Sequence, residues 1–208
     1  MDAIFLDIDG TLWDSTHTVA KAWNQVLETK EEISLRVTPQ RLKQLFGKPL
    51  YEIAAALFPE YPPKKQQELI DDCCSKEHDL LIREPGIIFP KVTETIKTLS
   101  QCYPICIVSN CEAGYIELVT KKLGIISCIT DWECPGYSGL SKGENIRLVM
   151  ERNGYKNILY VGDTQGDYEA CQFAQVPFVY CRYGFGQPVG YDYAIDCFSQ
   201  LIKLAKKI

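Results

Sequence analysis

The chain has 208 residues, of which 46% are hydrophobic and 24% are charged, and its formal net charge is -5. This composition is typical of a folded globular protein, and the negative charge argues against nucleic acid or an anionic membrane as the main partner. Because no apolar run approaches the length of a membrane span and the N-terminus lacks a basic signal segment, we expect a cytoplasmic protein.

The first predicted strand, residues 4–6, is followed directly by two carboxylates, Asp7 and Asp9. Side chains alternate across a strand, so both carboxylates face the same way. Two such groups stay ionised together most easily when a cation lies between them, and Mg²⁺ favours carboxylate and phosphate oxygens. Taken alone, Asp9-Gly10-Thr11 fits an ordinary turn equally well. Motifs elsewhere in the chain are needed to distinguish a cation site from such a turn.

Residues 16–83 are predicted to form an all-helical insert. The expected helices cover residues 19–27, 38–47, 50–57 and 64–82. The insert leaves the sheet at the carboxyl end of the first strand, where α/β folds bind their ligands. We therefore expect a helical lid of residues 16–83 over a core formed by residues 1–15 and 84–208.

From Gly86 onward, helix-like and strand-like segments alternate. The expected helices are residues 90–100, 112–123, 144–153 and 168–174, and the expected strands are residues 105–108, 125–129, 158–161 and 176–181. Continuous apolar strands separated by helices are typical of a parallel sheet covered on both faces. The predicted fold class is α/β, a doubly wound, Rossmann-like parallel sheet with an inserted all-α domain.

Polar residues follow three of the later segments: Ser109-Asn110, Lys142, and the pair Asp163 and Asp167. A serine hydroxyl with backbone N–H groups suits an anion, a lysine neutralises phosphate charge, and Asp163 could bind a cation directly. Each pattern also has an ordinary explanation, as a helix cap, a solvated lysine or a capped turn. The motifs are therefore informative only in combination.

The ten cysteines include no Cys-x-x-Cys pair, and half of them lie in apolar stretches. This pattern predicts reduced thiols without a metal or redox function. Only Cys111, beside the proposed site, leaves a redox role open.

Together these motifs resemble the four motifs of the haloacid dehalogenase superfamily of phosphotransferases, and the likeness covers the whole chain. The matching segments are Asp7-Ile8-Asp9-Gly10-Thr11, Ser109-Asn110, Lys142 and Gly162-Asp163-Thr164-x-x-Asp167. The helical insert is similar to the small α-helical cap of the phosphoglycolate phosphatase and β-phosphoglucomutase group. Its loop Gly47-Lys48-Pro49-Leu50 resembles that group's cap loop, and Tyr183-Gly184-Phe185-Gly186 its C-terminal turn.

The resemblance implies a mechanism for a small phosphate monoester. Asp7 would attack phosphorus and form an aspartyl-phosphate. Asp9 would protonate the leaving oxygen and then take a proton from the attacking water. Ser109, Asn110 and Lys142 would hold the phosphate oxygens.

The resemblance also implies Mg²⁺ as the cofactor. The ion would be held by Asp7, by Asp9 through its backbone carbonyl and by Asp163, while Asp167 would orient its waters. Thr11 would support this loop or join the phosphate site. One departure is Gly143, which follows the motif lysine where the family often has proline, and which is expected to loosen that loop.

Two alternatives to a phosphatase stay open. A β-phosphoglucomutase-like mutase would carry a histidine at the position of Val19, whereas His17 lies two residues away and faces elsewhere on a helix. A catalytically inactive binding or regulatory protein on the same fold would lose motif residues, and none is lost. The acid at Asp9 disfavours dehalogenase or phosphonate chemistry.

The sequence does not name the substrate beyond a small phosphorylated metabolite. Arg41, Lys43 and Lys48 in the helical insert are candidates for binding a second anionic group, although Arg41 and Lys43 do not share a helical face. Phosphoglycolate, sugar phosphates, nucleotides and pyrophosphate all stay open. We expect no nucleic-acid or membrane partner, and a monomer or weak dimer.

Overall fold

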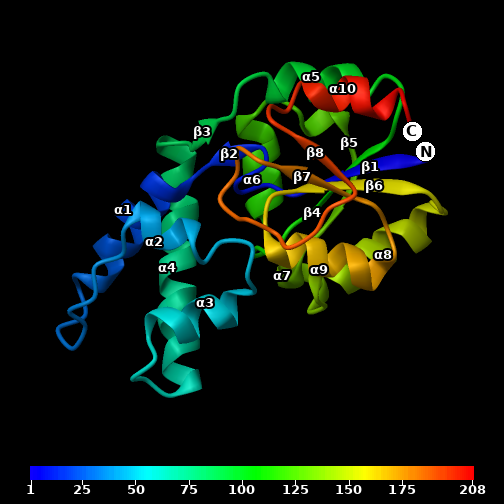
Figure 1. The fold of residues 1–208 in the computed structure, drawn as a ribbon. Helices are drawn as coiled ribbons and strands as arrows, with labels where there is room; N and C mark the ends of the chain where they lie inside the picture. Colours follow the sequence, from blue (N-terminus) through cyan, green and yellow to red (C-terminus); the bar gives the residue numbers. More distant parts are fainter.

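A computed structural model describes residues 1–208, and its centre is a six-stranded parallel sheet of order β5-β4-β1-β6-β7-β8 (Figure 1). Every neighbouring pair in this sheet is parallel. The strands are β1 (Ala3–Leu6), β4 (Ile105–Val108), β5 (Ile129–Glu133), β6 (Ile158–Gly162), β7 (Phe178–Cys181) and β8 (Tyr193–Ile195). The predicted doubly wound α/β fold is therefore confirmed.

Helices cover both faces of the sheet, as the continuous apolar strands require. One layer contains α5 (Val92–Leu99), α6 (Tyr115–Lys122) and α10 (Gln200–Ala205); the other contains α7 (Pro135–Ser138), α8 (Lys142–Asn153) and α9 (Gln165–Ala174). In β1, Ile4 and Leu6 belong to the larger apolar cluster, while Ala3 and Phe5 belong to the smaller cluster beneath α8 and α9. Successive side chains of one strand thus stabilise both layers.

The remaining helices form a group beside the carboxyl ends of the strands (Figure 1). They are α1 (Thr16–Leu27), α2 (Pro39–Lys43), α3 (Leu50–Leu57) and α4 (Pro63–Arg83). Helices α1 and α3 both pack against α4. A two-stranded antiparallel ribbon, β2 (Trp13–Asp14) with β3 (Ile87–Ile88), joins the two places where the chain leaves and re-enters the core.

The structure corrects two expected boundaries. Residues 126–128 form a short 3-10 turn, and the strand expected at 125–129 lies instead at Ile129–Glu133. Its polar residues are satisfied because Arg152 pairs with Asp131 and Glu133 at this edge of the sheet. Helix α2 ends at Lys43, before the expected end at Gly47.

The chain beyond β7 holds elements that the hydrophobic pattern did not reveal, namely β8 and α10. None of the helices combines the length and the apolar character that crossing a bilayer requires.

Candidate active site

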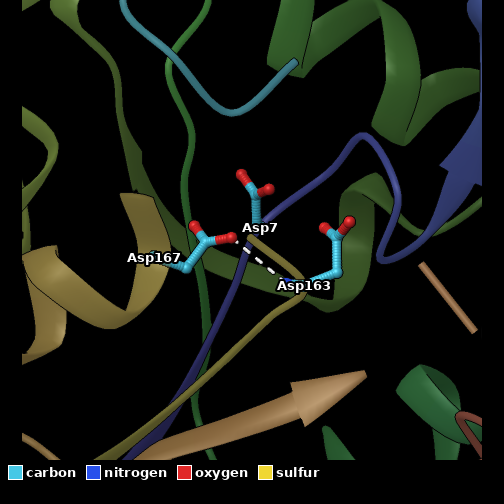
Figure 2. A group of neighbouring side chains, drawn as sticks. All are labelled: Asp7, Asp163 and Asp167. Atoms are coloured by element: carbon cyan, nitrogen blue, oxygen red, sulfur yellow. Dashed lines mark hydrogen bonds between the residues drawn. The ribbon is translucent and has the colours of Figure 1, made fainter. Parts of the chain in front are cut away.

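Three carboxylates meet where β1 and β6 end. Asp7 follows β1, Asp163 follows β6, and Asp167 lies in the first turn of α9 (Figure 2). One oxygen of each lies within 4.8 Å of the others, and all three side chains are buried. The chain adds β4 and β5 on one side of β1 and then adds β6, β7 and β8 on the other side. The point between β1 and β6 where the strand order switches is where open α/β sheets bind their ligands.

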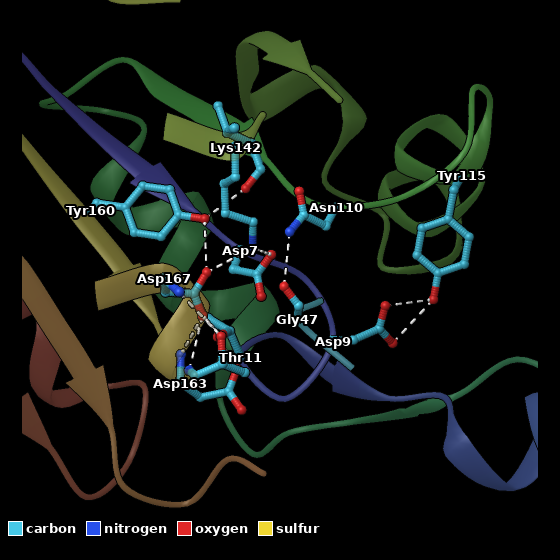
Figure 3. A network of polar contacts seen from close by, with 12 residues as sticks. Asp7, Asp9, Thr11, Gly47, Asn110, Tyr115, Lys142, Tyr160, Asp163 and Asp167 are labelled. Atoms are coloured by element: carbon cyan, nitrogen blue, oxygen red, sulfur yellow. Dashed lines mark hydrogen bonds and ion pairs between the residues drawn. The ribbon is translucent and has the colours of Figure 1, made fainter. Parts of the chain in front are cut away.

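The Lys142 ammonium lies between two of these carboxylates, with Nζ 3.0 Å from Asp7 Oδ1 and 2.7 Å from Asp167 Oδ1 (Figure 3). Burial alone would lower the pKa of Lys142, but the charges of Asp167 and Asp7 hold it above its usual value. The buried site therefore contains three carboxylates and a single ammonium group.

Lys142 is the first residue of α8 and is held there by local sequence. Ser141 and Glu144 form a capping box, in which each side chain bonds the other's backbone N–H. Gly143 is buried against Phe173, where a Cβ would come within 2.7 Å of the ring. The expected loosening of this loop is therefore wrong: both residues belong to a capped helix.

Asp167 is held by the chain on both oxygens. Its Oδ2 accepts from the backbone N–H groups of Asp163 and Thr164 at 3.1 and 2.9 Å and from the Thr164 hydroxyl at 2.7 Å. Its Oδ1 accepts from Lys142 and, at 3.3 Å, from Tyr160. Burial raises the pKa of Asp167, but the Lys142 charge together with the hydrogen bonds from Lys142 and Thr164 holds the pKa below its usual value. Asp167 is thus a charged anchor for the site.

Asp163 is positioned by two distant segments. The Thr11 hydroxyl donates to Oδ1 at 3.1 Å, and the Phe185 N–H donates to Oδ2 at 2.7 Å. Burial and the charges of Asp167 and Asp7 raise the pKa of Asp163 well above its usual value. Because its proton is given to Asp163, the Thr11 hydroxyl is not free to donate to a phosphate, and Thr11 does not line the cavity described below.

The turn formed by residues 183–186 closes over Asp163. A Cβ on Gly184 would lie 2.3 Å from the Asp163 Cβ, so only glycine fits there. The Tyr183 hydroxyl donates to the Thr11 carbonyl at 2.8 Å. This segment, noted in the sequence without a role, fixes the second acidic motif against the first.

The Asp9 side chain points away from the three-carboxylate cluster and toward α6 (Figure 3). It accepts hydrogen bonds from the Ser15 hydroxyl and from the Tyr115 hydroxyl, the latter at 2.9 Å from Oδ2. Burial raises the pKa of Asp9 to about 7, although both hydroxyls favour the ionised form. A carboxyl group with this pKa can give or take a proton near neutral pH.

Burial and the charge of Asp167 likewise raise the pKa of Asp7, to about 6, while Lys142 and the Ser109 hydroxyl act in the opposite direction. Ser109 follows β4 and is buried beside Asp7. The Asn110 side chain donates from Nδ2 to the Gly47 carbonyl at 2.8 Å, and its Oδ1 is buried without a partner. Asn110 therefore ties the core to the loop between α2 and α3.

A cavity of about 60 Å³ lies between these residues and the helices α1, α3 and α4. Asp7, Asp9 and Ser109 line it from the core. Trp23, Phe46, Ile53 and Glu77 are among the residues that line its other side.

Of the three basic residues proposed to bind a second anion, only Lys48 lines this cavity. Lys43 instead pairs with Asp14 at 2.6 Å and lies over the Phe185 ring. Arg41 is exposed and donates to the Ala56 carbonyl at 3.2 Å. These contacts place the Arg41 and Lys43 charges away from the cavity.

Ser15, Glu77 and Tyr115 belong to the site but were absent from the sequence-based candidates. The sequence could have indicated that Glu77 faces inward, because it lies four residues from Cys73 and from Leu81 on the buried face of α4. Tyr115 had no such signal, since it is 106 residues from the Asp9 that it contacts. Ser15 had none either, because its contact with Asp9 depends on how the chain turns between them.

The sequence model of the haloacid dehalogenase-like hydrolases matches residues 4–181. No curated protein sequence matches the chain. Among solved structures, a predicted phosphoglycolate phosphatase from Haemophilus somnus superimposes with a TM-score of 0.84 and 20% identity, covering 99% of this chain and 98% of the other. A predicted phosphatase from Clostridium acetobutylicum has a TM-score of 0.83 and 17% identity over 100% and 99%. A haloacid dehalogenase-like protein from Streptococcus pneumoniae has a TM-score of 0.82 and 21% identity over 100% and 99%.

The raised pKa of Asp9 predicts how Asp9→Asn changes stability with pH in metal-free protein. The folded state holds the Asp9 proton up to a pH of about 7, whereas the usual value is 3.8, so ionisation of Asp9 opposes folding as the pH rises between these values. Asparagine cannot ionise. The variant should gain about 3 to 4 kcal/mol of unfolding free energy relative to wild type between pH 4 and 7.

Urea denaturation of both proteins in a chelator, at several pH values, measures this difference. Asp79→Asn, a change at an exposed carboxyl on α4, is the control and should give a flat difference. A flat difference for Asp9→Asn as well would contradict the assignment of a raised pKa to Asp9.

Proposed function

The chain belongs to the haloacid dehalogenase-like hydrolase family, and we propose that it is a Mg²⁺-dependent phosphatase acting on a small phosphate monoester through an aspartyl-phosphate intermediate. The observation that carries this proposal is the position of Asp7, a buried carboxylate bonded to Lys142 that lines the same cavity as Ser109. The phosphatase names of similar structures agree with it.

In the first step, an Asp7 oxygen attacks phosphorus and the bond from phosphorus to the ester oxygen breaks. The electron pair goes to the leaving oxygen, which takes a proton from Asp9. With a pKa of about 7, Asp9 holds that proton near neutral pH. Ser15 and Tyr115 orient the Asp9 carboxyl group.

In the second step, Asp9 takes a proton from water, and the water oxygen attacks phosphorus. The bond between Asp7 and phosphorus breaks, which releases inorganic phosphate and restores the Asp7 carboxylate. Lys142, Ser109 and the backbone N–H of Asn110 would stabilise the negative charge on the phosphate oxygens.

The residues present fit a divalent cation. Three buried carboxylates share one ammonium group, and buried charge of this excess is costly unless a cation compensates it. Asp7, Asp163 and the backbone carbonyl of Asp9 would hold Mg²⁺, with Asp167 supporting from α9. When bound, the ion offsets the charge of the phosphate and orients it for attack.

We assign residues 16–83 as the cap domain and residues 1–15 and 84–208 as the core. The cavity is too small for a phosphate ester with a large leaving group, so substrate entry requires the helices to move from the core. The contact between Asn110 and the Gly47 carbonyl would re-form on closure. The cytoplasmic location and the monomeric or weakly dimeric state stay predictions.

Two positions favour a phosphatase over a mutase. Val19, where the related mutases carry histidine, is fully buried in the apolar core. His17 is exposed and lines a separate surface groove with Lys21 and Asn24. Neither position offers a histidine to the cavity.

Replacing Asp7 with asparagine should lower the rate of phosphate release by at least about 1,000-fold, because the nucleophile is lost while the shape of the side chain is kept. The measurement is phosphate release from a panel of phosphate esters with Mg²⁺, with circular dichroism to verify folding. Cys102→Ser, at an exposed thiol, should keep wild-type activity. Turnover by Asp7→Asn at the wild-type rate would refute the proposed nucleophile.

Adding Mg²⁺ should raise the melting temperature of the wild type, because an ion that binds only the folded state stabilises it by about 2.7 kcal/mol at 100 times its Kd. Asp163→Asn should lose most of this increase, whereas Asp71→Asn, at an exposed position on α4, should keep it. Equal increases in all three proteins would show that Mg²⁺ binds elsewhere.

A further inference from the structure

The helical side of the cavity would face the leaving group, since Asp7 and Ser109 lie on the core side. Most of this wall is apolar or aromatic, including Trp23, Phe46 and Ile53. A few polar groups in such a wall decide which ligand binds and in which orientation.

Glu77 of α4 is a carboxyl group in this wall, and it is partly buried. Its Oε2 accepts a hydrogen bond from Trp23 Nε1 at 2.7 Å. Its Oε1 has no hydrogen-bond partner in the chain, and no lysine or arginine forms an ion pair with it. One carboxylate oxygen is therefore free to accept from a ligand.

The charges that act on Glu77 are those of Asp9 and Glu112, and both are negative. Burial and these charges raise the pKa of Glu77 to about 8. Within the cavity lining, Lys48 is the only lysine or arginine; it is exposed and also lines the neighbouring groove beside Gly143 and Gln165. Apart from His78, the inner wall thus offers no basic side chain to a second anionic group on the substrate, and such a group would raise the pKa of Glu77 further.

A positively charged group would be attracted by the same wall. It would lower the pKa of Glu77, favour its ionised form and pair with the free oxygen, which offsets the cost of burying that carboxylate. The rings of Trp23, Phe46 and Tyr115 line the same cavity, and aromatic faces attract ammonium groups. With the helices in this position, the space of about 60 Å³ suits a group with a short chain.

We infer that the leaving group is a short amino alcohol whose ammonium group binds Glu77, so that the substrate is the phosphate monoester of a small amine. This inference rests on the proposed phosphatase function and names its substrate class. Glu77 and the aromatic wall select the cation over a carboxylate of the same length.

Three esters with the same two-carbon length separate the possibilities: O-phosphoethanolamine with an ammonium group, 2-hydroxyethyl phosphate with a hydroxyl and phosphoglycolate with a carboxylate. The wild type with Mg²⁺ should show a kcat/KM for O-phosphoethanolamine about 10- to 100-fold above that for phosphoglycolate, the range expected for one charged hydrogen bond. A preference for phosphoglycolate, or equal values for the two, would overturn the inference.

Glu77→Gln keeps the shape of the side chain and an acceptor for Trp23 but removes the charge. The ratio of kcat/KM for O-phosphoethanolamine to that for 2-hydroxyethyl phosphate should fall at least about tenfold in this variant. Glu68→Gln makes the same change at an exposed position of the same helix and should leave the ratio unchanged. An unchanged ratio in a folded Glu77→Gln protein would also overturn the inference.

Failure of the proposed function is distinguishable from failure of the inference. If the wild type releases no phosphate from any ester of the wider panel, the phosphatase assignment fails, whereas release from other esters but not from O-phosphoethanolamine overturns the inference alone. Calorimetry then measures how tightly the Asp7→Asn protein binds each ester. Because this measurement needs no turnover, it tests the selectivity of the cavity wall separately from catalysis. Tighter binding of O-phosphoethanolamine than of phosphoglycolate would support a cation-selective cavity, and weaker or equal binding would overturn it.

Discussion

A single ammonium group, that of Lys142, is shared by the Asp7 and Asp167 carboxylates in the interior of the protein. Without this group, three buried carboxylates would face one another uncompensated, a loss that typically costs several kcal/mol. The surrounding structure serves this arrangement. Two strand ends deliver Asp7 and Asp163, and two capped helices hold Lys142 and Asp167 in fixed positions. The remaining negative charge makes the site suited to a cation, which would in turn offset the charge of a phosphate.

The core and the helices divide the proposed chemistry between them. The core residues that bond, protonate or neutralise the phosphate do not depend on what the phosphate is attached to. The side of the cavity formed by α1, α3 and α4 carries the free oxygen of Glu77 and can distinguish leaving groups. Asn110 links the two parts through the Gly47 carbonyl. In the proposed closure of the helices, this contact would re-form beside the proposed phosphate site.

Much of this fold was predictable because β1, β4, β6 and β7 are continuous apolar runs that are buried on both sides. The sequence-based prediction misplaced strand β5, because the polar residues of this strand pair with Arg152, a contact that no local pattern reveals. The ordered motifs identified the residues at the strand ends. The partners of Asp9 and Asp163 were not predictable, because Tyr115 and Phe185 reach them only through the tertiary fold. Long-range hydrogen bonds of this kind decided the details of the site.

The most direct test of the account is to trap the covalent intermediate. Wild-type protein would be mixed with Mg²⁺ and an intact ester that it hydrolyses, quenched in acid and then treated with hydroxylamine. Hydroxylamine converts an aspartyl-phosphate to a hydroxamate. Mass spectrometry of the digested chain should then find this modification at Asp7 and at no other carboxylate. A phosphoryl group on another residue, such as His78, or turnover without any modification of Asp7, would contradict the mechanism.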